Sequence, residues 1–365
     1  MSQHEQHMAH ALQLAKRGLY TTDPNPRVGC VIVKNERVIG EGWHHRAGEA
    51  HAEINALNMA GTAAQGADCY VTLEPCSHFG RTPPCAEALI RAGIKRVLVA
   101  MTDPNPIVAG TGIERLRQAG IEVHEGLFAK QAEQLNPGFC QRMRIGRPFV
   151  RTKIAMSLDG RTAMASGESK WITGPEARHD VQKLRARSSA ILTGIGTVLA
   201  DDPMLNVRPQ GEWYPDPEHI RQPLRVVVDS DLRMPVKAKI LGGDKVLLAT
   251  AGDKVMRADI ETVVLPTADK QVDLTALLSV LAKREINEVM VEAGADLNGA
   301  LLRAQLIDEL IFYVAPKLMG SDARAAFNLT GLLRMDQNID LQITDIRPIG
   351  KDWRITATPI YNEVF

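Results

Sequence analysis

Residues 51–53 read His51-Ala52-Glu53, and the pair Pro75-Cys76 and then Cys85 follow later in the chain. One imidazole and two thiolates suit zinc, and three protein ligands leave a fourth position for a water whose pKa the metal lowers. Glu53 lies close to the metal without being needed as a ligand, so it can move protons between water and a departing amine. This combination is typical of zinc deaminases as a class. We therefore expect His51, Cys76 and Cys85 to bind zinc and Glu53 to be catalytic.

The spacing of the two cysteines departs from the Pro-Cys-x-x-Cys pattern of that class. Eight residues, 77–84, separate them, and this insertion is polar and rich in proline. The alternatives are a structural zinc site, or two free thiols beside a surface histidine. A structural site normally has four protein ligands and no use for Glu53, so the catalytic interpretation is favoured.

Composition narrows the class of function. Lys plus Arg equals Asp plus Glu, at 43 each in 365 residues. A nucleic-acid-binding protein normally carries a basic excess, so we expect a small-molecule substrate and no nucleic acid. Neither a leader nor a membrane span is evident, which predicts a cytoplasmic protein.

The chain is long enough for two domains, and its cysteines are unevenly distributed. All five lie before residue 141. Apolar runs at 28–33, 69–72 and 95–101 predict strands, and 51–60, 85–92 and 112–119 predict helices. Later strands are expected at 148–156, 190–193, 224–228, 245–249, 288–292, 309–315 and 353–361, and Thr173 to Glu176 fits a capping box. The basic segment 142–148 breaks this α/β pattern, so we expect domains 1–146 and 147–365.

These residues closely resemble one family, the bifunctional riboflavin-biosynthesis deaminase/reductases, over nearly the whole chain. The resemblance rests on the motifs at 24–29, 51–53, 74–78, 80–85, 103–106, 157–160, 171–173, 200–203 and 291–294. It implies a cytidine-deaminase-like three-layer α/β/α domain followed by a dihydrofolate-reductase-like α/β domain. The first would remove the 2-amino group of 2,5-diamino-6-(5-phosphoribosylamino)pyrimidin-4(3H)-one. The second would reduce the ribosyl group to ribityl with NADPH.

The same resemblance implies residues for the deaminase pocket. Asn25, Asp103 and Asn105 would line it, with His78 and Arg81 near the sugar phosphate. An Arg is a natural partner for a phosphate. Asn25 belongs to the first of two Asp-Pro-Asn-Pro runs, and Asp103 and Asn105 belong to the second. The alternative for both runs is ordinary turn chemistry.

Two glycine turns in the second module follow predicted strands, at 194–197 and 294–299. Neither completes a Gly-x-Gly-x-x-Gly fingerprint, so a Rossmann fold is not supported, and each alone could be a plain connector. The resemblance places these residues on NADPH: Ala155, Trp171, Thr197, Asp201, Ser230, Gly294, Ala295, Asp296, Leu297, Asn298, Gly299 and Ala300. It places these near the substrate: Lys153, Ser169, Arg185, Leu205, Arg208 and Glu292. Lys153, Asp201 and Glu292 are the ionisable candidates for catalytic proton transfer in the reduction, and the sequence does not choose among them.

Two other functions compete with this one. The first is a single-activity zinc nucleotide deaminase with a regulatory nucleotide-binding C-terminal domain. The second is a non-catalytic zinc-binding interaction module, which Glu53 and the open ligand position disfavour. We expect a homodimer or higher homo-oligomer, although the residues do not fix the oligomeric state. They also leave the choice between NADPH and NADH open.

Overall fold

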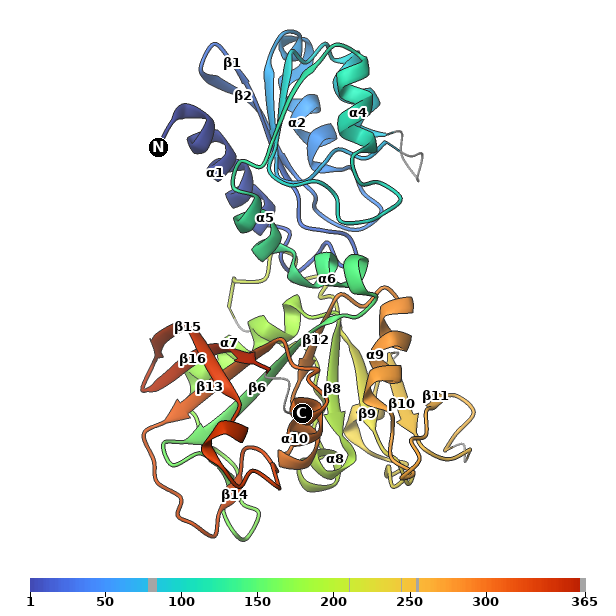
Figure 1. The fold of residues 1–365 in the computed structure, drawn as a ribbon, viewed down its shortest axis with the longest axis vertical. Helices are drawn as coiled ribbons and strands as arrows, with labels where there is room; N and C mark the ends of the chain where they lie inside the picture. The colour runs from blue at the N-terminus through green and yellow to red at the C-terminus, as the bar shows by residue number, and fades with distance from the viewer. Residues whose placement is uncertain (78–83, 210, 244, 254–255, 362–365) are drawn as a thin grey trace. The chain divides into compact units, whose positions relative to one another are not determined.

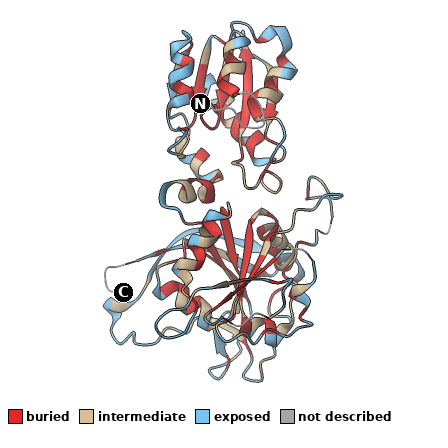
Figure 2. Cartoon of the chain, turned by 90° about the vertical axis from the view of Figure 1, so that its right-hand side faces the viewer, coloured by how far each residue is buried: buried red, intermediate tan, exposed pale blue. Residues whose placement is uncertain are grey.

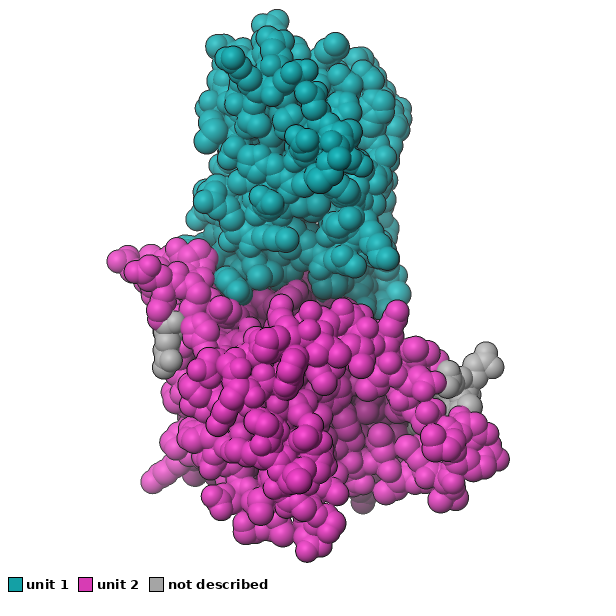
Figure 3. Space-filling model, turned by 90° about the vertical axis from the view of Figure 1, so that its left-hand side faces the viewer, with its two compact units in different colours: residues 1–146 teal, residues 147–365 magenta. Residues whose placement is uncertain are grey.

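The structure is a computed structural model of residues 1–365, and it describes all of them except 78–83, 210, 244, 254–255 and 362–365. The chain forms two compact units, Met1–Gly146 and Arg147–Phe365 (Figure 3). Each unit has buried residues of its own along the strands of its sheet (Figure 2). Among the described residues, no helix is long and apolar enough to cross a membrane.

The first unit is built on a five-stranded sheet of order β2-β1-β3-β4-β5. Strand β1 is antiparallel to β2 and β3, whereas β3, β4 and β5 are parallel. The strands are β1 (Gly29–Lys34), β2 (Arg37–Trp43), β3 (Asp68–Val71), β4 (Arg96–Val99) and β5 (Glu122–Glu125).

Helices cover both faces of this sheet (Figure 1). On one face, α2 (Ala52–Ala60), α3 (Cys85–Arg91) and α4 (Thr111–Gln118) pack against alternate strand residues such as Ile32 and Val97. On the other, α1 (Gln3–Lys16), α5 (Ala129–Leu135) and α6 (Pro137–Ile145) pack against the intervening residues, such as Val31 and Leu98. Because successive strand residues point to opposite faces, this alternation produces the expected three-layer α/β/α domain.

The second unit contains a nine-stranded sheet of order β11-β10-β9-β8-β12-β6-β13-β16-β15. Its strands are parallel except for β16 and β15, which add an antiparallel hairpin beside β13. Their bounds are β6 (Phe149–Ser157), β8 (Ala190–Gly194), β9 (Leu224–Val228), β10 (Val246–Thr250), β11 (Glu261–Val264), β12 (Glu288–Val291), β13 (Glu309–Ala315), β15 (Asp340–Ile349) and β16 (Asp352–Ile360). Strands β7 (Arg161–Ala163) and β14 (Arg324–Ala325) form a separate pair.

Helices also cover both faces of the larger sheet. One core cluster joins α7 (Pro175–Arg187) and α8 (Ile195–Asp201) to strand residues such as Ile191 and Met290. The other joins α9 (Leu274–Lys283) and α10 (Ala295–Arg303) to residues such as Leu192 and Val291. Strands buried on both faces are typical of parallel sheets, which explains their continuous apolar sequences.

The start of α7 corrects one expectation. The predicted capping box at Thr173 is wrong, because the N-cap residue is Gly174 and no side chain of the helix caps it. The Gly174 amide instead donates to Oδ2 of Asp352, at 2.6 Å, from the distant strand β16. The residue before α7 is thus held by a tertiary contact and not by a local capping box.

Candidate functional site

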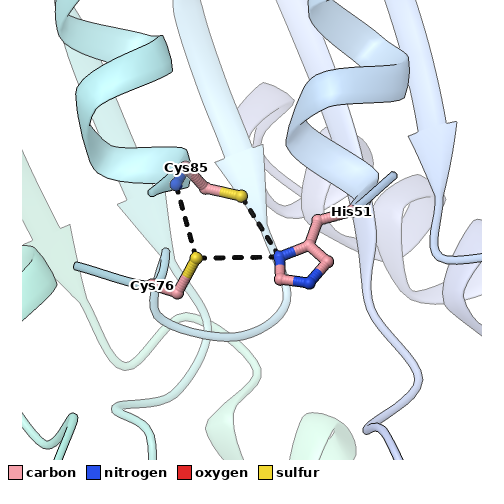
Figure 4. A group of neighbouring side chains, drawn as sticks. All are labelled: His51, Cys76 and Cys85. Carbon is pink, nitrogen blue, oxygen red and sulfur yellow. Dashed lines mark hydrogen bonds between the residues drawn. The ribbon is translucent and has the colours of Figure 1, made fainter. Parts of the chain in front are cut away.

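Two helix starts and one loop bring the predicted zinc ligands together (Figure 4). His51 is the N-cap residue of α2, Cys85 is the first residue of α3, and Cys76 lies in the loop after β3. Nδ1 of His51 lies 3.3 Å from Sγ of Cys85 and 3.7 Å from Sγ of Cys76. The Cys85 backbone amide donates to Sγ of Cys76, at 3.3 Å.

This donor set fits zinc. A tetrahedral zinc with ordinary Zn–N and Zn–S bonds holds its ligand atoms about 3.5 Å apart. The three ligand atoms, all within 4.8 Å of one another, therefore need little movement to bind a metal. Within the part of the chain that the structure describes, this group includes no fourth ligand. Three protein ligands are typical of a catalytic rather than a structural zinc site.

The two thiols of the site differ in acidity. Hydrogen bonds from the Cys85 thiol, from His51 and from the Cys85 amide lower the pKa of Cys76 to about 4. The hydrogen bond to Cys76, together with burial, raises the pKa of Cys85. Cys76 is therefore the first of the pair to become a thiolate, the form that binds metals.

Glu53 lies in the first turn of α2 and is 3% exposed. Burial raises its pKa to about 7, against the opposing effect of His51. A carboxyl group with a pKa near neutrality can both accept and donate a proton in the working pH range. Burial and this pKa suit a group that moves protons, and the catalytic role of Glu53 stays a prediction.

Asn25 is linked to the metal ligand His51 by His44, a residue that was not among the predicted site residues. Nδ1 of His44 lies 3.1 Å from the carbonyl of Ala50, so this nitrogen donates and Nε2 is the acceptor. Nδ2 of Asn25 donates to that Nε2 at 3.0 Å, and the His44 ring meets the His51 ring edge-on, with centroids 5.3 Å apart. Burial lowers the pKa of His44, which favours this neutral form. The ring contact with His51 could not be inferred from sequence.

The second Asp-Pro-Asn-Pro run forms two successive turns. Oδ1 of Asp103 accepts from the Asn105 amide at 2.8 Å, and Oδ1 of Asn105 accepts from the Ile107 amide at 3.1 Å. These bonds are the turn chemistry that stood as the alternative for this run. Contact with substrate stays a prediction for both residues. His78 and Arg81 lie outside the described residues.

In the second unit, three charged side chains meet beside adjacent parallel strands. Glu292 follows β12 and accepts from Arg185 of α7 with both oxygens, at 2.6 and 3.0 Å. Nζ of Lys153, on β6, lies 3.8 Å from Oε2 of Glu292. Burial lowers the pKa of Lys153, although Glu292 opposes this effect. Burial raises the pKa of Glu292, but Arg185 and Lys153 outweigh it and the net pKa is lowered.

The two glycine turns lie side by side, because β8 and β12 are neighbouring parallel strands. Helix α8 begins after Gly194 and α10 after Gly294, so backbone amides of both helices are available to an anion. A Cβ atom added at Gly196 or Gly294 would meet no protein atom within 4 Å. This open space fits a bound dinucleotide phosphate, which needs close approach to the backbone.

Later residues of the second turn face the protein itself. A Cβ atom at Gly299 would lie 2.2 Å from the carbonyl oxygen of Asn328. Asn298 is buried, and its Nδ2 donates to the carbonyls of Ala293 and Ala326. These two residues thus have a clear packing role, and their contact with NADPH stays a prediction.

Several other predicted residues have contacts of their own in the second unit. Oγ of Ser169 lies 3.5 Å from Oδ1 of Asp201, the last residue of α8. Trp171 is 64% exposed and has Arg178 over its ring. Thr197 lies in α8 and Ala155 in β6, Ser230 accepts from the Val272 amide at 3.2 Å, Leu205 is buried, and Arg208 is exposed.

Comparison with known proteins covers both units. Residues 1–101 match the family model "Cytidine and deoxycytidylate deaminase zinc-binding region", and residues 148–355 match "RibD C-terminal domain". The riboflavin biosynthesis protein RibD of Escherichia coli is 52% identical over 363 residues, covering 96% of this chain and 98% of that protein. The RibD protein of Haemophilus influenzae is 50% identical, covering 96% of each chain.

Two solved structures match the fold over nearly the full length. RibD from Acinetobacter baumannii, form 1, has a TM-score of 0.92 at 49% identity and covers 98% of this chain and 99% of its own. A diaminohydroxyphosphoribosylaminopyrimidine deaminase/5-amino-6-(5-phosphoribosylamino)uracil reductase from Thermotoga maritima has a TM-score of 0.87 at 32% identity, with the same coverage.

Proposed function

This chain belongs to the RibD family of bifunctional riboflavin-biosynthesis deaminase/reductases, and we propose that its two activities divide at residue 146. The enzyme has a zinc-binding deaminase region and a reductase region that uses NADPH. Residues 1–146 would be the deaminase domain, since they contain the His51, Cys76 and Cys85 group. Residues 147–365 would be the reductase domain, since they contain both open glycine turns.

The proposed substrate is 2,5-diamino-6-(5-phosphoribosylamino)pyrimidin-4(3H)-one, a phosphorylated small molecule. The name of the Thermotoga maritima deaminase/reductase supports it, as does the likeness of that protein over 98% of this chain. The deaminase would release the 2-amino group as ammonia. The product, 5-amino-6-(5-phosphoribosylamino)uracil, would then be the substrate of the reductase.

In the deaminase, His51, Cys76 and Cys85 would hold zinc, which supplies Lewis-acid activation of water when bound. Glu53 would accept a proton from the attacking water and donate one to the departing amine, as its buried position and its pKa near 7 allow. His44 and Asn25 would keep the His51 ring in place through the observed ring contact and hydrogen bond. Different residues would thus orient the metal ligand and move the proton.

In the reductase, NADPH supplies a hydride when bound. Between Lys153 and Glu292, the geometry favours Lys153 as the proton donor, and Asp201 stays the alternative. Both oxygens of Glu292 already accept from Arg185, whereas Lys153 has protons to give and a lowered pKa. Lys153 would protonate the ribose ring oxygen as the C1′–O4′ bond breaks, leaving a protonated imine (an iminium) whose C1′ would accept the hydride to give the neutral ribitylamine.

The match over both units carries this proposal, and one assay tests it. The purified chain is supplied with the diaminopyrimidine phosphate, and ammonia release and NADPH oxidation are followed together. We expect one NADPH oxidised per ammonia released. Ammonia without NADPH oxidation would instead support the single-activity deaminase with a regulatory C-terminal domain.

We infer a homodimer or higher homo-oligomer in the cytoplasm, where NADPH and a phosphorylated substrate are retained. Strand β15 is a ten-residue edge strand with exposed apolar side chains. Its residues Leu341, Ile343 and Ile346 share a face with Trp353 of β16, and all four are at least 42% exposed. Unpaired apolar edges normally have a partner. Sedimentation of Ile346→Lys tests this: an oligomer of unchanged size would exclude this edge as the contact.

A further inference from the structure

Glu74 is a buried acid that the proposed mechanism does not use. It lies in the loop between β3 and Cys76 and is 3% exposed. Its backbone amide donates to the Met101 carbonyl at 3.0 Å, just after β4. A buried carboxylate is costly unless its oxygens accept hydrogen bonds, so the partners of Glu74 indicate what it does.

The Glu74 carboxylate accepts four backbone amides from one stretch of chain. Oε2 accepts from Asp103 at 3.0 Å and from Gly110 at 2.9 Å, so a single atom joins both ends of the 103–110 loop. Oε1 accepts from Gly112 at 2.8 Å and from Ile113 at 3.3 Å, which caps the start of α4. Charge-assisted bonds to free helix amides are among the stronger ones in proteins.

Two further contacts hold the same junction. A Cβ atom at Gly112 would lie 1.9 Å from the carbonyl oxygen of Pro75, so α4 approaches the metal loop as closely as backbone permits. Oγ of Ser77 lies 2.6 Å from Oγ1 of Thr111. The loop that carries Cys76 and the loop that carries Asp103 and Asn105 are therefore joined through Glu74 and its immediate neighbours.

We propose that Glu74 is a positioning residue of the deaminase site, which fixes the turn at Asp103 and Asn105 relative to the metal ligand Cys76. The inference rests on the proposed function only in taking this turn as part of the substrate pocket. Glu74 is not a member of the group of metal-ligand atoms, and both of its carboxylate oxygens accept backbone amides. Its effect passes through the backbone amides of the turn.

The carboxylate is specifically required because all four partners are donors. An amide in its place has one acceptor oxygen and an NH2 group that cannot accept. Glu74→Gln therefore breaks at least two of the four bonds, either those of the 103–110 loop or those of the helix start. Loss of the Oε2 bonds releases the turn directly, and loss of the Oε1 bonds releases the start of α4, which follows the turn in the chain; the zinc ligands themselves are unchanged in both cases.

The test compares Glu74→Gln with the wild-type full-length enzyme. We expect the deaminase KM to rise at least about tenfold, equivalent to about 1.4 kcal/mol, with kcat changed far less. Zinc content should stay at the wild-type value, and hydrogen exchange should accelerate at amides 103–113. A matched control is Asp159→Asn in the second unit, since Asp159 also accepts loop amides, those of Met319 and Gly320. It should leave the deaminase KM unchanged.

A double-mutant cycle with Asn105→Ala separates positioning from general stability. If Glu74 acts through the turn, Asn105→Ala should raise KM in the wild type but by less than about twofold in Glu74→Gln. Independent, multiplying effects would overturn the proposal, as would a lower melting temperature with an unchanged KM or a loss of zinc. If Glu74→Gln does not fold, the same cycle is measured with the shorter Glu74→Asp, and the same results support or overturn the proposal. Wild-type ammonia release tests the proposed function separately.

Discussion

The metal centre of the first unit is built from side chains, whereas the glycine turns of the second unit are built from backbone. The metal centre consists of side chains: an imidazole, two thiols and a carboxyl group, three of them within 4.8 Å of one another. The glycine turns consist of backbone amides and of open space at Gly196 and Gly294. The metal centre should therefore lose its activity when a functional group is changed. The glycine turns should lose their affinity for the cofactor when a larger side chain is added.

The largest effect is expected from removing the metal ligands. Cys76→Ser with Cys85→Ser should abolish zinc binding and deamination, because oxygen replaces both soft ligands. NADPH-dependent reduction of the already deaminated intermediate should continue, since both cysteines lie in the first unit. Metal analysis and the two separate assays check this. Loss of reduction in a folded double variant would show that the two sites depend on one another.

Glu53→Gln should have the next largest effect. The amide keeps the size of the side chain but cannot move protons, so deamination should fall about a thousandfold, within the usual range for general acid–base catalysis. Zinc content and reduction should equal those of the wild type. Turnover within a few fold of the wild type would remove Glu53 from the mechanism.

The same contrast explains what the sequence could reveal. His51, Cys76, Cys85 and Glu53 can be predicted from residue type and motif. The structure brings the ligand atoms of the first three within 4.8 Å of one another and places Glu53 in the first turn of α2, just after His51. The apolar strands of both sheets were recognisable because they are buried. In contrast, β5 and the edge strand β15 are mostly exposed, and their sequences interleave polar and apolar residues without a continuous apolar run, so neither was predicted.

The features that the sequence did not predict depend on contacts between different segments of the chain. Glu74 accepts amides from residues 29 to 39 positions away, and Asp352 accepts the Gly174 amide, just before α7, across 178 positions. His44 becomes a candidate site residue only because its ring contacts the ring of His51. None of these partners is visible in local spacing. Residue type alone also cannot show that Gly294 opens into space while Gly299 packs against Asn328.

Lys153 tests whether the second unit also depends on one functional group. Lys153→Met should slow reduction about a hundredfold and leave deamination unchanged. Reduction requires the protonated amine, so the wild-type rate should fall as pH rises through the pKa of Lys153. Burial lowers that pKa, so the fall should begin below the range of an ordinary lysine. A pH–rate profile checks this, and Lys153→Arg should move the fall to higher pH; an unchanged profile would contradict the assignment.

Gly294→Val tests the role of open space. A valine Cβ meets no protein atom there, so folding should be little affected, but it would occupy room that a phosphate needs. The Kd for NADPH should rise at least about tenfold, or about 1.4 kcal/mol. Gly299→Ala gives the contrast, because its Cβ would collide with Asn328 and should mainly lower the melting temperature. Calorimetric titration separates the two, and unchanged affinity in Gly294→Val would make the turn at Gly194 the better candidate.

The smallest effect needs no substitution. Since the two units have separate cores, their thermal transitions should respond to different ligands. NADPH at a hundredfold excess over its Kd stabilises its binding unit by about 2.7 kcal/mol. For a unit of this size, that corresponds to a rise of about 5–10 °C in one transition.

A zinc chelator should lower the other transition and leave the NADPH-dependent one in place, because the ligands of the metal all belong to the first unit. Differential scanning calorimetry of the full chain, with each reagent alone and with both, measures the two shifts. A single transition moved by both reagents would mean that the units unfold together, and the contrast between the sites would then apply to their chemistry but not to their stability.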